Sequence, residues 1–144
     1  MPAAPADRPD IDLRRRTVRK HAELILERAR WLMPTDRAVI EAVYRDGFSV
    51  AHLADLHGSP PRSTRRRVRQ TVAAVMSVEF DFVLRHRDTW PPIRRRVATA
   101  CILQGRAMRD ASRHLKLSLH TVRTELGIIR ALIESEAPAA RRAG

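Results

Sequence analysis

Residues 34–70 read PTDRAVIEAVYRDGFSVAHLADLHGSPPRSTRRRVRQ, and this stretch decides the fold. Its apolar residues recur at spacings of three and four, which is typical of one buried face of a helix. Gly47 and Gly58 interrupt the pattern, and glycine is the residue that most often follows the end of a helix. The stretch therefore predicts three short helices joined by tight turns.

Residues that favour helix starts stand before each of the three segments. Thr35 is expected to cap the first, after Pro34 has ended a preceding helix, and Ser49 to cap the second, which runs to about residue 57. Ser59 is expected to cap the third, with Pro60 in the first helical position, where a missing N–H costs nothing. The expected inward residues are Val39, Ile40, Val43 and Tyr44, then Leu53 and Leu56, then Thr64, Val68, Val72 and Val75.

The same pattern occurs a second time, 58 residues further along the chain. This shift takes Gly47 to Gly105 and Val39 to Val97, without an insertion between them. Upstream, residues 11–32 carry apolar residues at helical spacing, and the shift takes Val18, Ile25 and Leu26 of this helix to Met76, Val83 and Leu84. A fixed internal period is the signature of a repeated unit, so we expect two tandem units of about four helices each.

The segment VEFDFVLRHR, residues 78–87, fits two interpretations. Its alternating apolar residues are compatible with a strand, but it takes the place of the opening helix of the first unit, which favours a helix. Trp90, Pro91 and Pro92 then break the chain before a helix that begins near Ile93. The strand remains the alternative.

These patterns predict an all-α fold of two tandem helix-turn-helix units joined by a continuous helical region. Unit one is expected to span residues 11–76 and unit two residues 77–136. Residues 1–10 and 137–144 offer no apolar residues at a structural period, so we expect a disordered N-terminal arm and a disordered tail.

Charge narrows the choice of partner. The chain of 144 residues carries 28 basic and 16 acidic side chains, a net charge of +12. Such an excess favours a polyanion, nucleic acid first and an anionic membrane surface second. At 44% hydrophobic residues, a chain of this length can bury only a modest core, which argues against a large enzyme pocket.

Signals for catalysis, metal binding and membrane insertion are missing from the sequence. Cys101 is the only cysteine, so an intramolecular disulfide is excluded, and the six histidines form no pair at metal-ligand spacing. The chain has no glycine-rich phosphate loop, no nucleophile elbow, no signal peptide and no membrane span. We therefore expect a soluble cytoplasmic protein without enzymatic activity, metal or other cofactor.

A helix, a tight turn and a second helix with a basic outer face make the helix-turn-helix plan, whose second helix enters the DNA major groove. Residues 34–70 resemble the promoter-recognising C-terminal domain of bacterial sigma factors. Residues 105–126, GRAMRDASRHLKLSLHTVRTEL, are similar to the DNA-binding domain of LuxR-type regulators, whose recognition helix often opens Ser-x-x-Thr-Val-Arg.

These resemblances imply DNA binding within residues 35–71 and 93–133. They do not imply transcription initiation, because the chain has no room for a promoter-melting domain. Unit one departs from the pattern at Pro60, where a capping serine is usual, and at Thr64, where an apolar residue is usual. Unit two has Lys116 in place of a turn glycine, and Ala111 and Ser112 in place of the usual Ile/Leu-Ala pair.

The two recognition helices differ in their expected outer faces. On the first, four arginines share a stripe at i, i+3, i+4 and i+7, suited to phosphates or guanine edges, although a merely solvated basic face is the alternative. On the second, one charge alternates with small polar and apolar groups, which favours base reading. The expected contacts are Arg62, Arg65, Arg66 and Arg69 on the first helix and Leu119, His120, Arg123 and Thr124 on the second.

Helix starts supply further candidate contacts. Ser118 is expected to cap the second recognition helix, while Ser63 and Thr121 are placed to bind a phosphate there, with ordinary capping as the alternative. Arg94, Arg95 and Arg96 begin a helix, where cations oppose the helix dipole, and a phosphate contact would explain them. The arginines at 14–16 form either an arm beside the groove or a frayed basic end.

The sequence thus predicts a sequence-specific protein that binds double-stranded DNA, of the kind that regulates bacterial transcription. Three alternatives stay open: an adaptor that binds RNA polymerase or another regulator, a protein that coats or organises DNA without specificity, and an RNA-binding protein. The chain acts as a monomer or as a homodimer paired through residues 128–134.

Overall fold

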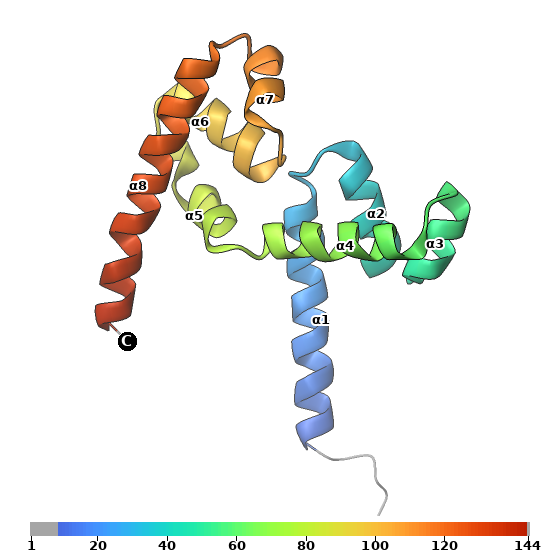
Figure 1. The fold of residues 1–144 in the computed structure, drawn as a ribbon. Coiled ribbons are helices and arrows are strands. Elements are labelled where there is room, and N and C mark those ends of the chain that lie inside the picture. The colour runs from blue at the N-terminus through green and yellow to red at the C-terminus, as the bar shows by residue number, and fades with distance from the viewer. Residues whose placement is uncertain (1–8, 144) are drawn as a thin grey trace, which may run out of the picture.

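A computed structural model describes residues 9–143, and it is helical from end to end (Figure 1). The described residues form eight α-helices, a 3-10 turn η1 and a π-helical turn η2, which confirms the all-α fold. In chain order these are α1 (Pro9–Ala29), α2 (Pro34–Tyr44), α3 (Val50–His57), α4 (Pro61–Val75), α5 (Val78–His86), η1 (Arg87–Thr89), α6 (Pro92–Ala98), η2 (Thr99–Leu103), α7 (Met108–Leu115) and α8 (Leu119–Ala143).

The repeat holds element for element. A shift of 58 residues carries the bounds of α3 onto those of α7 and the start of α4 onto the start of α8. Gly47 and Gly105 both have φ of 74°, the left-handed backbone that glycine adopts without strain. Even the turn hydrogen bonds correspond: Phe48 N–H donates to the Ala42 carbonyl, and Arg106 N–H to the Ala100 carbonyl, each at 3.0 Å.

Proline, and not the expected hydroxyl caps, sets two of the helix starts. Ser49 caps α3 as predicted, accepting from the His52 N–H at 3.1 Å. The predicted caps Thr35 and Ser59 are wrong, because the N-cap residues are Met33 and Pro60. A residue that precedes a proline is driven out of the helical region, so Pro34 and Pro61 become the first helical residues instead.

Residues 78–86 form helix α5, and the strand alternative is excluded. Ser77 caps the helix by accepting from the Phe80 N–H at 3.1 Å. Phe80, Phe82 and Val83 are buried along it. Between α4 and α5 the helical path breaks at Met76 and Ser77, where we expected it to continue.

One hydrophobic core runs through both units. Ile25 and Ile40 of the first unit belong to the same buried cluster as Phe80, Leu103 and Ile129 of the second. The expected inward position of Leu56 is wrong, since this side chain is 64% exposed. Helix α3 has barely two turns, and it buries Leu53 and Ala54 on the side that faces α4.

Arg28 also ties the two units together. Its Nη1 donates to the Val75 carbonyl at the end of α4, and its Nη2 pairs with Asp81 of α5, both at 2.8 Å. The Arg28 side chain is only 13% exposed and its partner Asp81 is 43% exposed, so the ion pair is partly buried. Nearby, the guanidinium of Arg87 stacks 4.8 Å from the Trp31 ring. The relative position of the units is therefore fixed by packing and by these links.

Both ends of the described chain are more helical than expected. Helix α1 already begins at Pro9, within the predicted arm, while residues 1–8 of that arm lie outside the described residues. Helix α8 continues to Ala143, within the expected tail over 137–144, while residue 144 lies outside the described residues. The N-terminal half of α1 extends away from the other helices (Figure 1).

Candidate nucleic-acid interface

Helix α4 presents its arginine stripe as predicted. Arg62, Arg65, Arg66 and Arg69 are exposed, and together they line a shallow hollow of about 290 Å³. On the opposite face Thr64, Val68 and Val75 are buried against the core, and Val72 is half-buried. The apolar face therefore holds the helix so that the four guanidinium groups point outward.

Arg67, on the same helix, has a different role. Its Nε and Nη2 donate to one carboxylate oxygen of Asp36, at 3.0 and 2.9 Å, which ties α4 to α2. Within the described side chains, none of the four stripe arginines has such an ion-pair partner. The stripe thus keeps its full charge for an external anion.

The outer face of α8 lies at the positions that correspond to the stripe. The 58-residue shift takes Arg62 to His120, Arg65 to Arg123, Arg66 to Thr124 and Arg69 to Gly127. All four residues of this second set are exposed. Leu119, expected to point outward, is half-buried. Helix α8 therefore offers one positive charge among small and polar groups.

Hydroxyl groups gather at the start of α8. Ser118 caps the helix as predicted, since its Oγ accepts from the Thr121 N–H at 3.1 Å. The two hydroxyls also lie 2.8 Å apart, so the Thr121 side chain is already engaged within the chain. The corresponding residue of unit one, Ser63, is exposed.

Arg94 and Arg95 are engaged inside the protein. The Nε of Arg94 donates to Glu125 of α8 at 2.9 Å, and both side chains are mostly buried, at 23% and 19% exposed. Arg95 is half-buried and reaches the Trp90 carbonyl at 3.5 Å. We expected phosphate contacts because no neighbouring residue in the sequence neutralised these charges. Glu125 neutralises the charge of Arg94, so the position of Arg94 is explained without a phosphate.

The sequence contained a signal for this ion pair that residue spacing alone did not expose. A shift of 58 residues takes Asp36 to Arg94 and Arg67 to Glu125. Each unit therefore has one ion pair at the same place, between α2 and α4 in unit one and between α6 and α8 in unit two, but the signs of the charges are reversed. Comparison of the two copies at charged positions would have revealed it.

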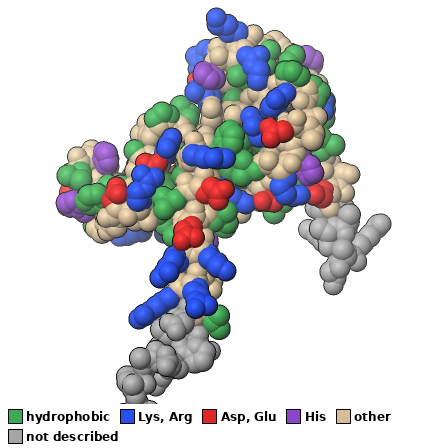
Figure 2. All heavy atoms as spheres, turned by 180° about the vertical axis from the view of Figure 1, so that it is seen from behind, with side chains coloured by type: hydrophobic (Ala, Val, Ile, Leu, Met, Phe, Trp, Pro, Cys, Tyr) green, Lys and Arg blue, Asp and Glu red, His purple; other side chains and the backbone are tan. Residues whose placement is uncertain are grey.

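A third basic surface lies on the projecting half of α1. Arg14, Arg15, Arg16, Arg19 and Lys20 are all exposed there. Figure 2 shows basic side chains around this projection. Leu13 and Val18, at 59% and 68% exposed, lie on the same helix. The projecting half of α1 is therefore an exposed, positively charged surface separate from α4 and α8 (Figure 1).

Other kinds of site find little support in the described residues. Within them, no group of three His, Cys, Asp or Glu side chains lies close enough to hold a metal ion, and no helix is long and apolar enough to cross a bilayer. Burial raises the pKa of the Cys101 thiol, which disfavours the reactive thiolate.

Comparisons with protein-family models, with curated proteins and with solved structures found no match to this chain. The interpretation of the surfaces above therefore depends on their geometry and chemistry.

Proposed function

We propose that this protein binds double-stranded DNA through α4 and α8 and acts as a transcriptional regulator. The observation that carries the proposal is the correspondence of the two outer faces. Both helices present the same four positions to solvent, one set wholly basic and the other mixed. A repeated helix-turn-helix unit with such a face fits the major groove.

The two helices suit different tasks. Four unpaired arginines on α4 suit phosphates, which bind strongly but without sequence information. On α8, Arg123 suits a guanine edge, and His120 and Thr124 suit other base edges or a thymine methyl group. In this proposal α4 supplies most of the affinity and α8 most of the specificity.

The shared core supports a further property of the proposed complex. Since the units pack on one another, a single chain can hold two recognition helices at one fixed separation. The recognised site would then consist of two unlike elements, one for each unit. A footprint on a perfect palindrome, bound by two chains, would contradict this property.

The first experiment is selection from a randomised duplex pool over a series of salt concentrations, with sequencing of the retained DNA. Binding that weakens steeply with salt and enriches a two-part motif would support a sequence-specific regulator. Steep salt dependence without a motif would favour a protein that coats DNA. No retention at moderate salt would reject DNA binding.

One observation favours the adaptor as a second candidate. Phe48 and Leu56 of unit one are 41% and 64% exposed, and the Phe48 ring stacks on His52 with 5.3 Å between ring centroids. These exposed apolar side chains are available for contact with a protein partner. If Leu56→Asp abolished binding of purified bacterial RNA polymerase and left DNA retention unchanged, the adaptor role would be supported.

A further inference from the structure

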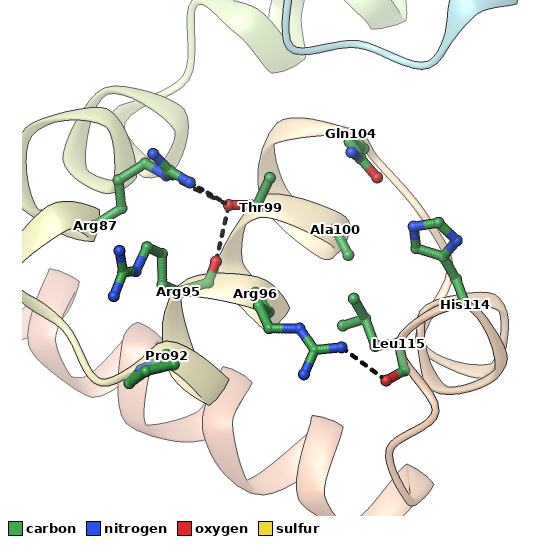
Figure 3. A pocket seen from close by; sticks show the side chains of 9 residues that line it. All are labelled: Arg87, Pro92, Arg95, Arg96, Thr99, Ala100, Gln104, His114 and Leu115. Carbon is green, nitrogen blue, oxygen red and sulfur yellow. Dashed lines mark hydrogen bonds between the residues drawn. The ribbon is translucent and has the colours of Figure 1, made fainter.

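A cavity of about 380 Å³ lies in unit two, and no residue of α4 or α8 lines it. Its lining comes from η1, α6, η2 and α7. Figure 3 shows the side chains around it. Its volume falls within the range of about 300–1,000 Å³ that small-molecule sites occupy.

The lining is basic and contains no acid. Arg87, Arg95 and Arg96 contribute three guanidinium groups, and His114 adds an imidazole. Asp88 pairs with Arg87 at 3.2 Å, but this carboxylate is 81% exposed and does not line the cavity. The field inside the cavity is therefore positive.

Neutral polar groups complete the lining. Thr99 Oγ1 donates to the Arg95 backbone carbonyl at 2.8 Å and accepts from the Arg87 guanidinium at 3.2 Å, which positions the Arg87 side chain relative to η2. The amide oxygen of Gln104 accepts from Arg106 at 2.8 Å, so its NH₂ group is left to donate to another acceptor. Arg96 donates to the Leu115 carbonyl at 2.9 Å, beside an apolar patch of Leu115, Ala100 and Pro92. Donors and an apolar patch thus share one space.

Unit one carries acids where this cavity carries neutral groups. The 58-residue shift takes Glu41 to Thr99 and Asp46 to Gln104, while Arg37 corresponds to Arg95. In unit one the Arg37 guanidinium is neutralised by Glu41 at 2.7 Å, and this contact lowers the pKa of the Glu41 carboxyl. In unit two Arg95 corresponds to Arg37, but Thr99 stands in the place of Glu41. Among the described side chains Arg95 has no ion-pair partner, so its charge is available to an external anion.

The helix that precedes the turn ends with a wide turn at the same place. Residues 99–103 form a π-helical turn, in which the Gln104 N–H donates to the Thr99 carbonyl at 2.9 Å. The corresponding end of α2 has the same bond, from the Asp46 N–H to the Glu41 carbonyl at 3.1 Å. Single π turns within helices occur frequently at functional sites, because they move side chains out of the regular helical positions. Thr99 and Ala100 of this turn both line the cavity.

We propose that this cavity binds a small organic phosphate, with the phosphoryl group held by Arg87, Arg95 and Arg96 and the organic part against Leu115. Arginine forks bind phosphate oxygens in pairs, and the Gln104 amide can donate a further hydrogen bond. The free protein would therefore bind such a ligand without DNA.

The test is isothermal titration of the full chain, without DNA, with ADP and with inorganic pyrophosphate at about 0.15 M salt, where exposed charges are largely screened. We expect one saturable site for ADP. Equal affinity for pyrophosphate would show that the phosphoryl groups alone provide recognition, and tighter binding of ADP would show that the apolar patch contributes. Failure of both probes to bind saturably would overturn the proposal.

Variants show whether binding occurs in this cavity. Thr99→Glu places a carboxylate next to Arg95, as Glu41 lies next to Arg37 in unit one. It should weaken ADP binding about tenfold or more, which corresponds to ~1.4 kcal/mol or more. Arg95→Gln should do the same by removing a donor, and it tests the proposal if Thr99→Glu fails to fold. The matched control is Arg109→Gln, which removes an exposed arginine of α7 outside the lining. Equal weakening by the control would mean unspecific anion binding and would overturn the assignment.

Discussion

Gly58 and Lys116 occupy the same place in the two units and have the same left-handed backbone, with φ of 63° and 57°. Each follows the first helix of a helix-turn-helix pair and ends it. Glycine takes this conformation freely, but a residue with a Cβ is strained there. Lys116 is the only residue other than glycine with positive φ in the described chain.

Replacing Lys116 with glycine should therefore stabilise the protein. Relief of the left-handed strain, ~1–2 kcal/mol, outweighs the extra freedom of glycine in the unfolded chain, ~0.5–1 kcal/mol, and leaves a gain of up to about 1.5 kcal/mol. Gly58→Ala should lose a similar amount. Urea denaturation followed by circular dichroism measures both changes. An unchanged midpoint for Lys116→Gly would mean that the lysine side chain compensates for the strain through contacts of its own.

The reversed ion pairs predict the result of exchanging two charges. Asp36→Arg and Arg67→Glu should each destabilise unit one, because each places like charges between α2 and α4. The double variant should recover part of the loss, with a coupling of ~0.2–1 kcal/mol, the usual size for partly exposed pairs. Recovery should be incomplete, since an arginine at position 36 opposes the dipole at the start of α2. A double-mutant cycle in denaturant measures the coupling, and additive losses would contradict it.

Under the proposed function, the arginine stripe should control affinity. Arg65→Ala and Arg66→Ala should weaken binding to every duplex alike, and each should reduce the slope of log affinity against log salt by about 1. Fluorescence anisotropy over a salt series measures the slope. Arg45→Ala serves as the control, because this exposed arginine pairs with Glu41 away from the stripe. An unchanged slope in the stripe variants would mean that their guanidinium groups do not contact phosphates.

The outer face of α8 should instead control sequence preference. Arg123→Ala or His120→Ala should relax the preference at one base pair by ~1–3 kcal/mol and leave the affinity for unrelated DNA nearly unchanged. Competition between the preferred duplex and single-base variants measures this discrimination. If discrimination is the same in the parent protein and in both variants, α8 is not the reading helix.

A pH dependence follows from the contact between α8 and α5. Arg85 donates to both carboxylate oxygens of Glu136, at 3.0 and 3.1 Å, and this lowers the pKa of the Glu136 carboxyl below its usual range. A carboxyl with a lowered pKa in the folded state adds stability above its unfolded pKa of about 4.3 and loses it as the pH falls through the folded value.

Glu136→Gln should therefore destabilise the protein at neutral pH and should match the parent protein once the pH is low enough to protonate Glu136. Denaturation of both proteins at several pH values measures the difference. A difference that does not shrink toward acid pH would show that the contact acts through packing and not through charge.

The helices and their repeat could be predicted from sequence because both depend on local signals. Apolar spacing located the buried faces of α2 and α4, and glycines located the turns. The caps Thr35 and Ser59 were wrong because a neighbouring proline changes the backbone of the residue before it, an effect stronger than capping preference. The prediction that Leu56 points inward was wrong because a helix of two turns has too few residues to define one buried face.

The candidate surfaces were predictable only where a helix faces solvent. The exposed stripe on α4 followed from the inward positions opposite it, whereas Arg94 lies on a helix start that packs on α8, so its partner Glu125 depends on tertiary contact. The cavity in unit two has lining residues from four elements, and no local pattern connects Arg87 with His114.

The reversal of the two ion pairs also affects how a tandem repeat chooses its own partners during folding. Neighbouring copies of one unit can exchange helices and become trapped in wrong arrangements. Here an α2 that docked on α8 would bring Asp36 against Glu125, and an α6 that docked on α4 would bring Arg94 against Arg67. Like charges would meet in both wrong arrangements and opposite charges only in the native one. The reversed signs thus favour the docking of α2 on α4 and of α6 on α8 over the exchanged pairings.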